Sequence, residues 1–180
     1  MKNLLLGIIA ILFSFNGWTY NETDLAKFRA LNACESCDLS AANLSKVDLS
    51  KAYLDGANLS GANLTGAYLL RADLYEANLS KAYLDGAYLL GANLIDADLS
   101  GAHLNRANLN VARVDRTNLS GASLRHANLS GANLTDANLS GANLSGLNLT
   151  TTNLKNAKLD GAKYCKTQMP WGELNDDCEE

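Results

Sequence analysis

Residues 131–149 read GANLTDANLSGANLSGLNL, and within them an asparagine followed by a leucine returns after every five residues. The same spacing extends in both directions, because a leucine stands at each fifth position from Leu39 to Leu159, apart from Val114. Neither regular element fits this period, since an amphipathic helix needs apolar residues at i, i+3, i+4 and i+7, and a half-buried strand needs alternation. The repeat therefore predicts a chain that turns by the same angle after each unit, with the leucines pointing to one axis.

Composition and charge limit the class of protein. The chain has 180 residues, one proline and 47% hydrophobic residues, which is typical of one folded domain and argues against disorder. Its 15 Lys and Arg against 19 Asp and Glu give a net charge of −4, which disfavours a broad surface for nucleic acid or anionic lipid. Residues 37–163 contain 11 acidic and 11 basic residues, so the repeat stretch itself is neutral.

The repeat resembles a known family. GANLSGANL at residues 56–64, GAYLLGANL at residues 86–94 and the stretch at residues 131–149 are similar to the pentapeptide-repeat family, and the resemblance covers about residues 37–163. It implies an all-β fold, a right-handed quadrilateral β-helix of about six coils, in which four pentapeptides form one square coil. The central leucine and the alanine two residues before it are expected to face inward. The resemblance implies no single activity.

We expect four segments along the chain. They are a signal peptide over residues 1–19, an N-terminal cap over 20–36, the β-helix over 37–163 and a C-terminal cap over 164–180. A repeat rod needs caps because its open ends expose apolar side chains and unpaired strand edges.

The amino-terminal segment predicts export. Lys2 precedes a twelve-residue apolar run from Leu4 to Phe15, which is typical of a signal peptide and too short to span a bilayer. Gly17 to Thr19 only loosely match the preferred cleavage residues, and we place the cut before Tyr20. A buried helix of the mature fold and an uncleaved anchor are the alternatives.

A capping helix is predicted over residues 23–32. Asn21 lies just before it as a helix cap, and Leu25, Phe28 and Leu31 share one face of such a helix.

The four cysteines lie in two pairs at the two ends of the rod. Disulfide Cα atoms lie within about 7 Å of each other, whereas the rod is roughly 30 Å long. We therefore expect Cys165 to pair with Cys178 and close the tail, in which residues 169–172 form the turn of a hairpin-like lid. Cys34 and Cys37 are expected to form a local bridge or to be a reduced pair at inward positions. A redox or zinc site is disfavoured, because no βαβ pattern and no second pair of ligands accompanies them.

Few residues suggest chemistry. His103 and His126 are the only histidines, and no metalloprotease, nucleotide-binding or nucleophile-elbow motif occurs, so we expect no catalytic residue, no metal site and no cofactor. A coil of 20 residues would place both histidines with Arg106 and Arg125 on one outer face. That face is interpreted as solvated, with binding of an anion or an acidic partner as the alternative.

A contact surface is predicted in the first half of the repeat. Coils of 20 residues align pairs of tyrosines and leucines at outward positions where polar residues are usual. Such an exposed apolar strip is typical of a protein-contact or self-association site, although stacking that stiffens the sheet is the alternative. The candidate residues are Tyr68, Leu70, Tyr88, Leu90, Tyr75 and Ile95.

These observations predict a non-enzymatic, exported scaffold that mediates protein–protein interaction. The expected location is extracytoplasmic, in a periplasm, in the secreted fraction, or in a thylakoid lumen if the source is photosynthetic. The partner is an unknown protein or a second copy, with no nucleic acid and no membrane after signal cleavage. The alternative is a protein of the quinolone-resistance type, whose acidic rod resembles DNA and binds a topoisomerase. The neutral repeat disfavours this alternative, because a DNA mimic needs a negative stripe.

Overall fold

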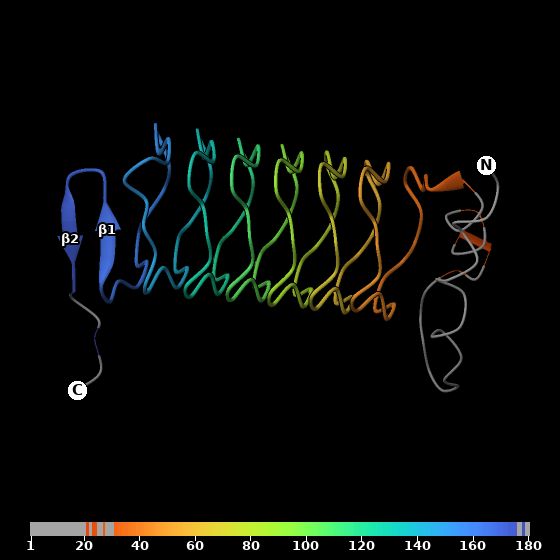
Figure 1. The fold of residues 1–180 in the computed structure, drawn as a ribbon, viewed down its shortest axis with the longest axis horizontal. Coiled ribbons are helices and arrows are strands. Elements are labelled where there is room, and N and C mark those ends of the chain that lie inside the picture. Colours follow the sequence, from red (N-terminus) through yellow and green to blue (C-terminus); the bar gives the residue numbers. More distant parts are fainter. Residues whose placement is uncertain (1–20, 22, 25–26, 28–30, 176–177, 179–180) are drawn as a thin grey trace.

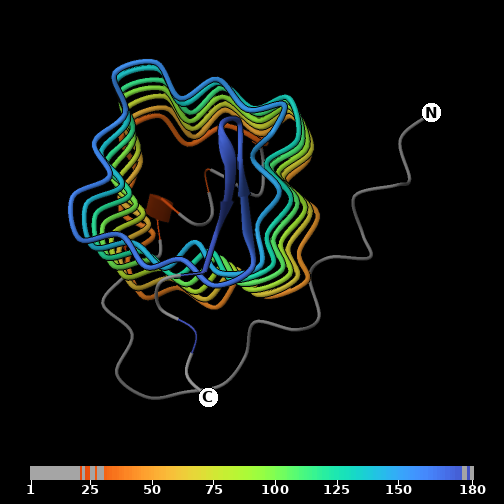
Figure 2. The same cartoon turned by 90° about the vertical axis from the view of Figure 1, so that its left-hand side faces the viewer.

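The chain winds into one long coil around a straight axis (Figure 1). Seen along the axis, the coil has a four-sided outline and its successive turns lie in register (Figure 2). Parallel bridges join residues that are 20 apart, from Ala33 with Tyr53 to Asn148 with Gln168. Each turn therefore takes four units of five residues, and the fold is the expected β-helix. The computed structural model describes residues 21, 23–24, 27, 31–175 and 178.

Leucines fill the centre of the coil. Every residue at the five-residue spacing from Leu39 to Leu149, including Val114, is at most 1% exposed. Most of the alanines that lie two residues before them are buried as well. In the last turn, Leu154 and Leu159 are only partly buried. The inward assignment of the repeat leucines is thus confirmed, and the apolar core runs along the whole axis.

Backbone hydrogen bonds join each turn to both of its neighbours. The N–H of Leu94 donates to the carbonyl of Arg113 in the next turn (2.8 Å), whereas the N–H of Asn93 donates to Ala72 in the preceding turn (2.9 Å). The same pattern recurs in nearly every unit of the coil. Because the chain changes direction after each unit, the ladder consists of isolated bridges and not of long strands.

The residue two positions after each leucine forms the corner. Its backbone is left-handed in every unit except at Thr151, with φ between 49° at Val111 and 72° at Gly146. L residues pay about 1–2 kcal/mol for this conformation, and β-branched residues adopt it rarely. Lysine, arginine and acidic residues occupy many of the other corners, where their side chains are mostly solvent-exposed.

Among the described residues, the buried polar side-chain atoms of the coil all have hydrogen-bond partners. Asn118 is representative of the residue before the leucine: its Oδ1 accepts the N–H of Ser120 (3.2 Å), and its Nδ2 donates to Oδ1 of Asp98 in the preceding turn (2.9 Å). Where threonine replaces the inward alanine, as at Thr117, its hydroxyl donates to the carbonyl of Leu94 (2.7 Å). These bonds satisfy the buried hydroxyl, which would otherwise cost about 1–3 kcal/mol.

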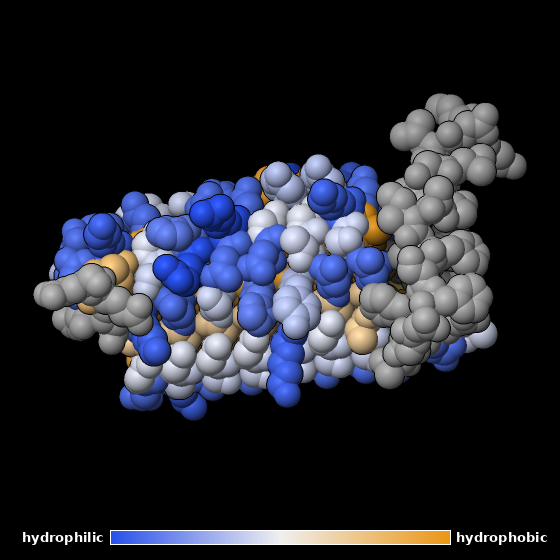
Figure 3. Space-filling model, turned by 90° about the horizontal axis from the view of Figure 1, so that it is seen from below, coloured by the Kyte–Doolittle hydropathy of each residue, from blue (hydrophilic) through white to orange (hydrophobic). Residues whose placement is uncertain are grey.

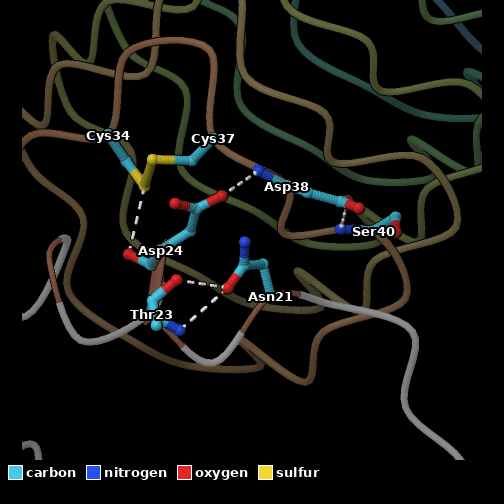
Figure 4. The surroundings of a disulfide bond; sticks show 7 residues. All are labelled: Asn21, Thr23, Asp24, Cys34, Cys37, Asp38 and Ser40. Carbon is cyan, nitrogen blue, oxygen red and sulfur yellow. Dashed lines mark hydrogen bonds between the residues drawn. A yellow bond between two sulfur atoms is a disulfide. The ribbon is translucent and has the colours of Figure 1, made fainter.

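The N-terminal end of the coil carries the first disulfide (Figure 4). Cys34 and Cys37 are bridged, with Cα atoms 5.2 Å apart, and both are buried at inward positions. The segment before them lies on this turn, because the N–H of Asn21 donates to the carbonyl of Asp38 and the carboxylate of Asp24 accepts the N–H of Asp38 (3.1 and 2.9 Å).

The predicted capping helix lies largely outside the described residues. Helical backbone is present at residues 23–24, 27 and 31, and Oδ1 of Asn21 accepts the N–H of Thr23. Leu31, predicted to share one helix face with Leu25 and Phe28, is solvent-exposed. Leu25 and Phe28 lie outside the described residues, as does the predicted signal peptide. Within the described residues, no helix is long and apolar enough for a membrane crossing.

A hairpin lies across the C-terminal end of the coil (Figure 2). Strand β1 (Thr167–Met169) pairs antiparallel with β2 (Gly172–Leu174), and Gln168 also bridges to Asn148 in the coil. The parallel pairing therefore extends beyond the stretch of residues 37–163 at both ends. Cys165 and Cys178 form a disulfide with Cα atoms 4.8 Å apart. The tail thus has the hairpin and the closing disulfide that were expected.

We expect Leu94→Asp to prevent soluble folding. The side chain is 1% exposed, and an unpaired charge on the apolar axis costs several kcal/mol. The matched control is Leu90→Asp, four residues earlier and solvent-exposed, which should fold as the parent does. Circular dichroism melting of both variants checks this expectation, and a parent-like melt for Leu94→Asp would contradict the inward assignment.

Candidate functional site

The four sides of the coil are named here as faces 1 to 4. Face 1 begins with residues 37–41, face 2 with 42–46, face 3 with 47–51 and face 4 with 52–56. Every segment that lies 20 residues further along belongs to the same face, because the bridges join residues at that step. On each segment, the residues that flank the leucine and the corner residue reach the surface in most turns.

Face 3 carries a contiguous apolar group. The rings of Tyr68 and Tyr88 stack with centroids 4.9 Å apart and planes 5° from parallel, and the side chains are 47% and 46% exposed. Leu70 and Leu90 lie beside them on the same two segments, 36% and 37% exposed. Val111 is exposed at the corner of the next segment. These five residues are called the tyrosine patch.

Four of the six predicted contact residues lie in the tyrosine patch, whereas Tyr75 and Ile95 lie on face 4. Ile95 is only 7% exposed, so its prediction as a contact residue is wrong. Tyr75 and Asp115 occupy the place of Ile95 in the preceding and the following turn. Ile95 therefore lies between these two side chains. Tyr75 is exposed, and the neighbouring Glu76 carboxylate raises the pKa of Tyr75.

Face 4 is instead a polar surface with an ion pair. Nε and Nη2 of Arg116 donate to the two carboxylate oxygens of Asp96 in the preceding turn (2.7 and 2.6 Å). This two-pronged hydrogen bond lowers the pKa of Asp96 and raises the pKa of Arg116. Within the described residues it is the single ion pair of the protein.

The two histidines lie on face 2, as the 20-residue coil predicts. His103 stacks on Tyr83 with centroids 5.0 Å apart. His126 packs over Gly146, where a Cβ would collide with the imidazole ring. Arg106 and Arg125 are exposed on the same face and make no ion pair within the described residues.

Strongly hydrophilic side chains are not spread evenly over the rod. On the side drawn in Figure 3 they gather left of the centre, while most of the remaining surface is paler.

The described residues do not assemble a reaction centre. Among them, no group of three or more His, Cys, Asp or Glu side chains is arranged to hold a metal ion. Both histidines are held by packing, His103 against a tyrosine ring and His126 against a glycine. The described residues therefore offer contact surfaces and charge.

Sequence reasoning missed Val111 as part of the surface. The available signal was its residue type, because it is the only β-branched residue at a left-handed corner of the coil. Its Cγ1 lies 3.2 Å from the place that a Cβ on Gly131 would take, so it covers the corner of the next turn.

A model of pentapeptide repeats matches residues 34–71, 72–110, 117–156 and 132–163, with 8 copies. This chain therefore belongs to the pentapeptide-repeat family. No curated protein matches the sequence.

Solved structures of pentapeptide repeat proteins are similar to this chain. A pentapeptide repeat protein from the thylakoid lumen of Arabidopsis thaliana is 33% identical with a TM-score of 0.51, and the match covers 52% of this chain and 66% of that one. The chain thus spans slightly less than two thirds of the lumenal protein. A pentapeptide repeat protein from Nostoc PCC 7120 is 35% identical (TM-score 0.36, coverage 54% and 77%). QnrB1, a plasmid-mediated fluoroquinolone resistance protein, is 21% identical (TM-score 0.46, coverage 73% and 79%).

Ile95 and Leu90 allow a matched test of which side chains are structural. Both follow a core leucine, but Ile95 is 7% and Leu90 is 37% exposed. We expect Ile95→Ala to lower the free energy of unfolding by roughly 2 kcal/mol and Leu90→Ala by well under half of that. Denaturant unfolding of both variants measures the difference. Equal losses would show that Ile95 is no more buried than Leu90 in solution.

Proposed function

We propose that this protein is an exported, non-catalytic scaffold that binds another protein through the tyrosine patch. The observation that carries the proposal is the contiguous exposure of two tyrosines and two leucines on face 3. Exposed apolar groups of this kind mark contact sites, and tyrosine is enriched at the centre of interfaces. A partner would cover the patch and remove its apolar area from water.

The shape of the rod supports binding through its sides. Asn21 and Asp24 are hydrogen-bonded to the N-terminal turn, and the C-terminal turn is covered by β1 and β2. About six coils between these ends leave each face as a long flat surface. The four faces then present four separate columns of outward residues to a partner.

Export is supported by three observations. Residues 4–15 form the apolar run of a signal peptide, and all four cysteines form disulfides, which are typical of oxidising compartments. The lumenal Arabidopsis protein shows that a similar repeat rod exists outside the cytosol. The proposed location is therefore a periplasm or the secreted fraction, or a thylakoid lumen in a photosynthetic source.

Amino-terminal sequencing of the protein purified from its native cells tests the export proposal. We expect the mature chain to begin at Tyr20 and both disulfides to be found by peptide mapping without reduction. A chain that begins at Met1 and is recovered from the cytosol with reduced cysteines would refute export.

The contact proposal is tested by Tyr68→Ser combined with Tyr88→Ser. We expect this variant to lose partner capture from the compartment where the protein resides, while its melting curve stays close to that of the parent. Tyr53→Ser combined with Tyr83→Ser is the matched control, because these tyrosines are at least as exposed but lie on faces 4 and 2. Affinity capture followed by mass spectrometry is the measurement, and an unchanged partner in the first variant would overturn the assignment of the patch.

A further inference from the structure

The neutral repeat stretch separates its charges by face. Between residues 37 and 163, faces 2 and 3 hold six basic and two acidic residues, whereas faces 1 and 4 hold five basic and nine acidic residues. One half of the rod therefore has a net charge of +4 and the other half a net charge of −4. The bases of faces 2 and 3 are Lys46, Lys51, Arg71, Arg106, Arg125 and Lys163, and the acids are Asp48 and Asp85.

The bases of faces 2 and 3 are free to interact with a partner. All six are solvent-exposed, and none forms an ion pair within the described part of the chain. Of the two acids, Asp85 uses Oδ1 to accept the N–H of Asn105 (2.9 Å). On face 4, by contrast, Arg116 is neutralised by Asp96. Faces 2 and 3 therefore carry unpaired positive charge and few acidic residues.

Four of these bases surround the tyrosine patch. Lys51 and Arg71 hold the corner that ends face 3, and Lys46 and Arg106 hold the corner where face 3 begins. Cγ of Arg71 lies 3.5 Å from the place that a Cβ on Gly91 would take, so its stem lies across the corner next to Leu90. The patch is thus an apolar centre with a mainly basic rim, in which the exposed Asp48 beside Tyr68 is the single acidic residue of face 3.

We propose that the tyrosine patch binds an acidic segment of a protein, with apolar side chains on the tyrosines and leucines and carboxylates on the surrounding bases. This inference rests on the proposed function and adds the chemistry of the partner. A polar rim that complements the charge of the partner steers association and sets specificity, while the apolar centre supplies most of the affinity. Arginine suits this role because its guanidinium binds a carboxylate in a two-pronged manner.

A protein segment fits the patch better than a nucleic acid. Bases bind to aromatic side chains by stacking on an open ring face. The rings of Tyr68 and Tyr88 are 4.9 Å apart and stack on each other, which leaves no gap between them for a base. Leu70, Leu90 and Val111 add aliphatic area, for which a nucleic acid has little use.

The test uses three labelled probes. Two are synthetic peptides with the same tryptophans and leucines, which are flanked by glutamates in one peptide and by lysines in the other. The third is a thymidine oligonucleotide. Fluorescence anisotropy of the full mature chain is measured at about 50 mM and about 300 mM salt. Arg71→Glu combined with Arg106→Glu reverses the rim charge. Lys81→Glu combined with Arg113→Glu is the matched control, because it changes the net charge equally on faces 1 and 4.

We expect the glutamate peptide to bind the parent protein and to bind more weakly at the higher salt. Arg71→Glu with Arg106→Glu should weaken this binding by about tenfold, and the control pair by less than about twofold. Equal weakening by both pairs, equal binding of the lysine peptide, tighter binding of the oligonucleotide, or no binding of the glutamate peptide overturns the proposal. Circular dichroism confirms that each variant folds.

The same variants separate this inference from the proposed function. If Tyr68→Ser with Tyr88→Ser loses the native partner while Arg71→Glu with Arg106→Glu keeps it, the patch stands as the contact site and the acidic partner is wrong. If both variants keep the native partner, the patch itself is wrong.

Discussion

The left-handed corner after every fifth residue is the constraint on which the whole structure depends. At this position φ is positive in every unit from Ala41 to Gly161 except at Thr151, and the chain therefore changes direction by a similar amount each time. Because the change is nearly constant, each leucine returns to the axis, and each backbone N–H meets a carbonyl of the neighbouring turn. The leucine core and the hydrogen-bond ladder are thus both consequences of this turn.

The corner also explains why the sides of the rod differ so freely. Corner residues and most of the residues that flank the leucine reach the surface, so the identity of these exposed residues has little effect on the core. Face 3 carries stacked tyrosines, and face 4 carries the Asp96–Arg116 pair, on the same backbone. The surface can therefore be specialised for binding while stability is supplied from the axis, as expected of repeat proteins.

The period of five predicted the inward leucines, the length of a turn and the alignment of Tyr68 with Tyr88, because all three depend only on spacing along the chain. It predicted that Leu90 and Ile95 are both exposed, since both occupy the same place in the unit, whereas Ile95 is buried. Their difference comes from the neighbouring turns, which lie 20 residues away in the sequence. The same holds for Thr117, whose hydroxyl finds its acceptor 23 residues earlier. Side-chain contacts between turns thus decide the details that the repeat unit leaves open.

The 20-residue step ties the surface to the reading frame of the repeat. Duplication of a whole turn would lengthen the rod and leave every column aligned. Duplication of a single pentapeptide would keep the core equally well packed but rotate everything after it by a quarter turn, so that Tyr88 would leave the column of Tyr68. The core tolerates both duplications equally, but only duplication of a whole turn preserves the columns of surface residues. A binding surface on one face is therefore compatible with gain or loss of complete turns.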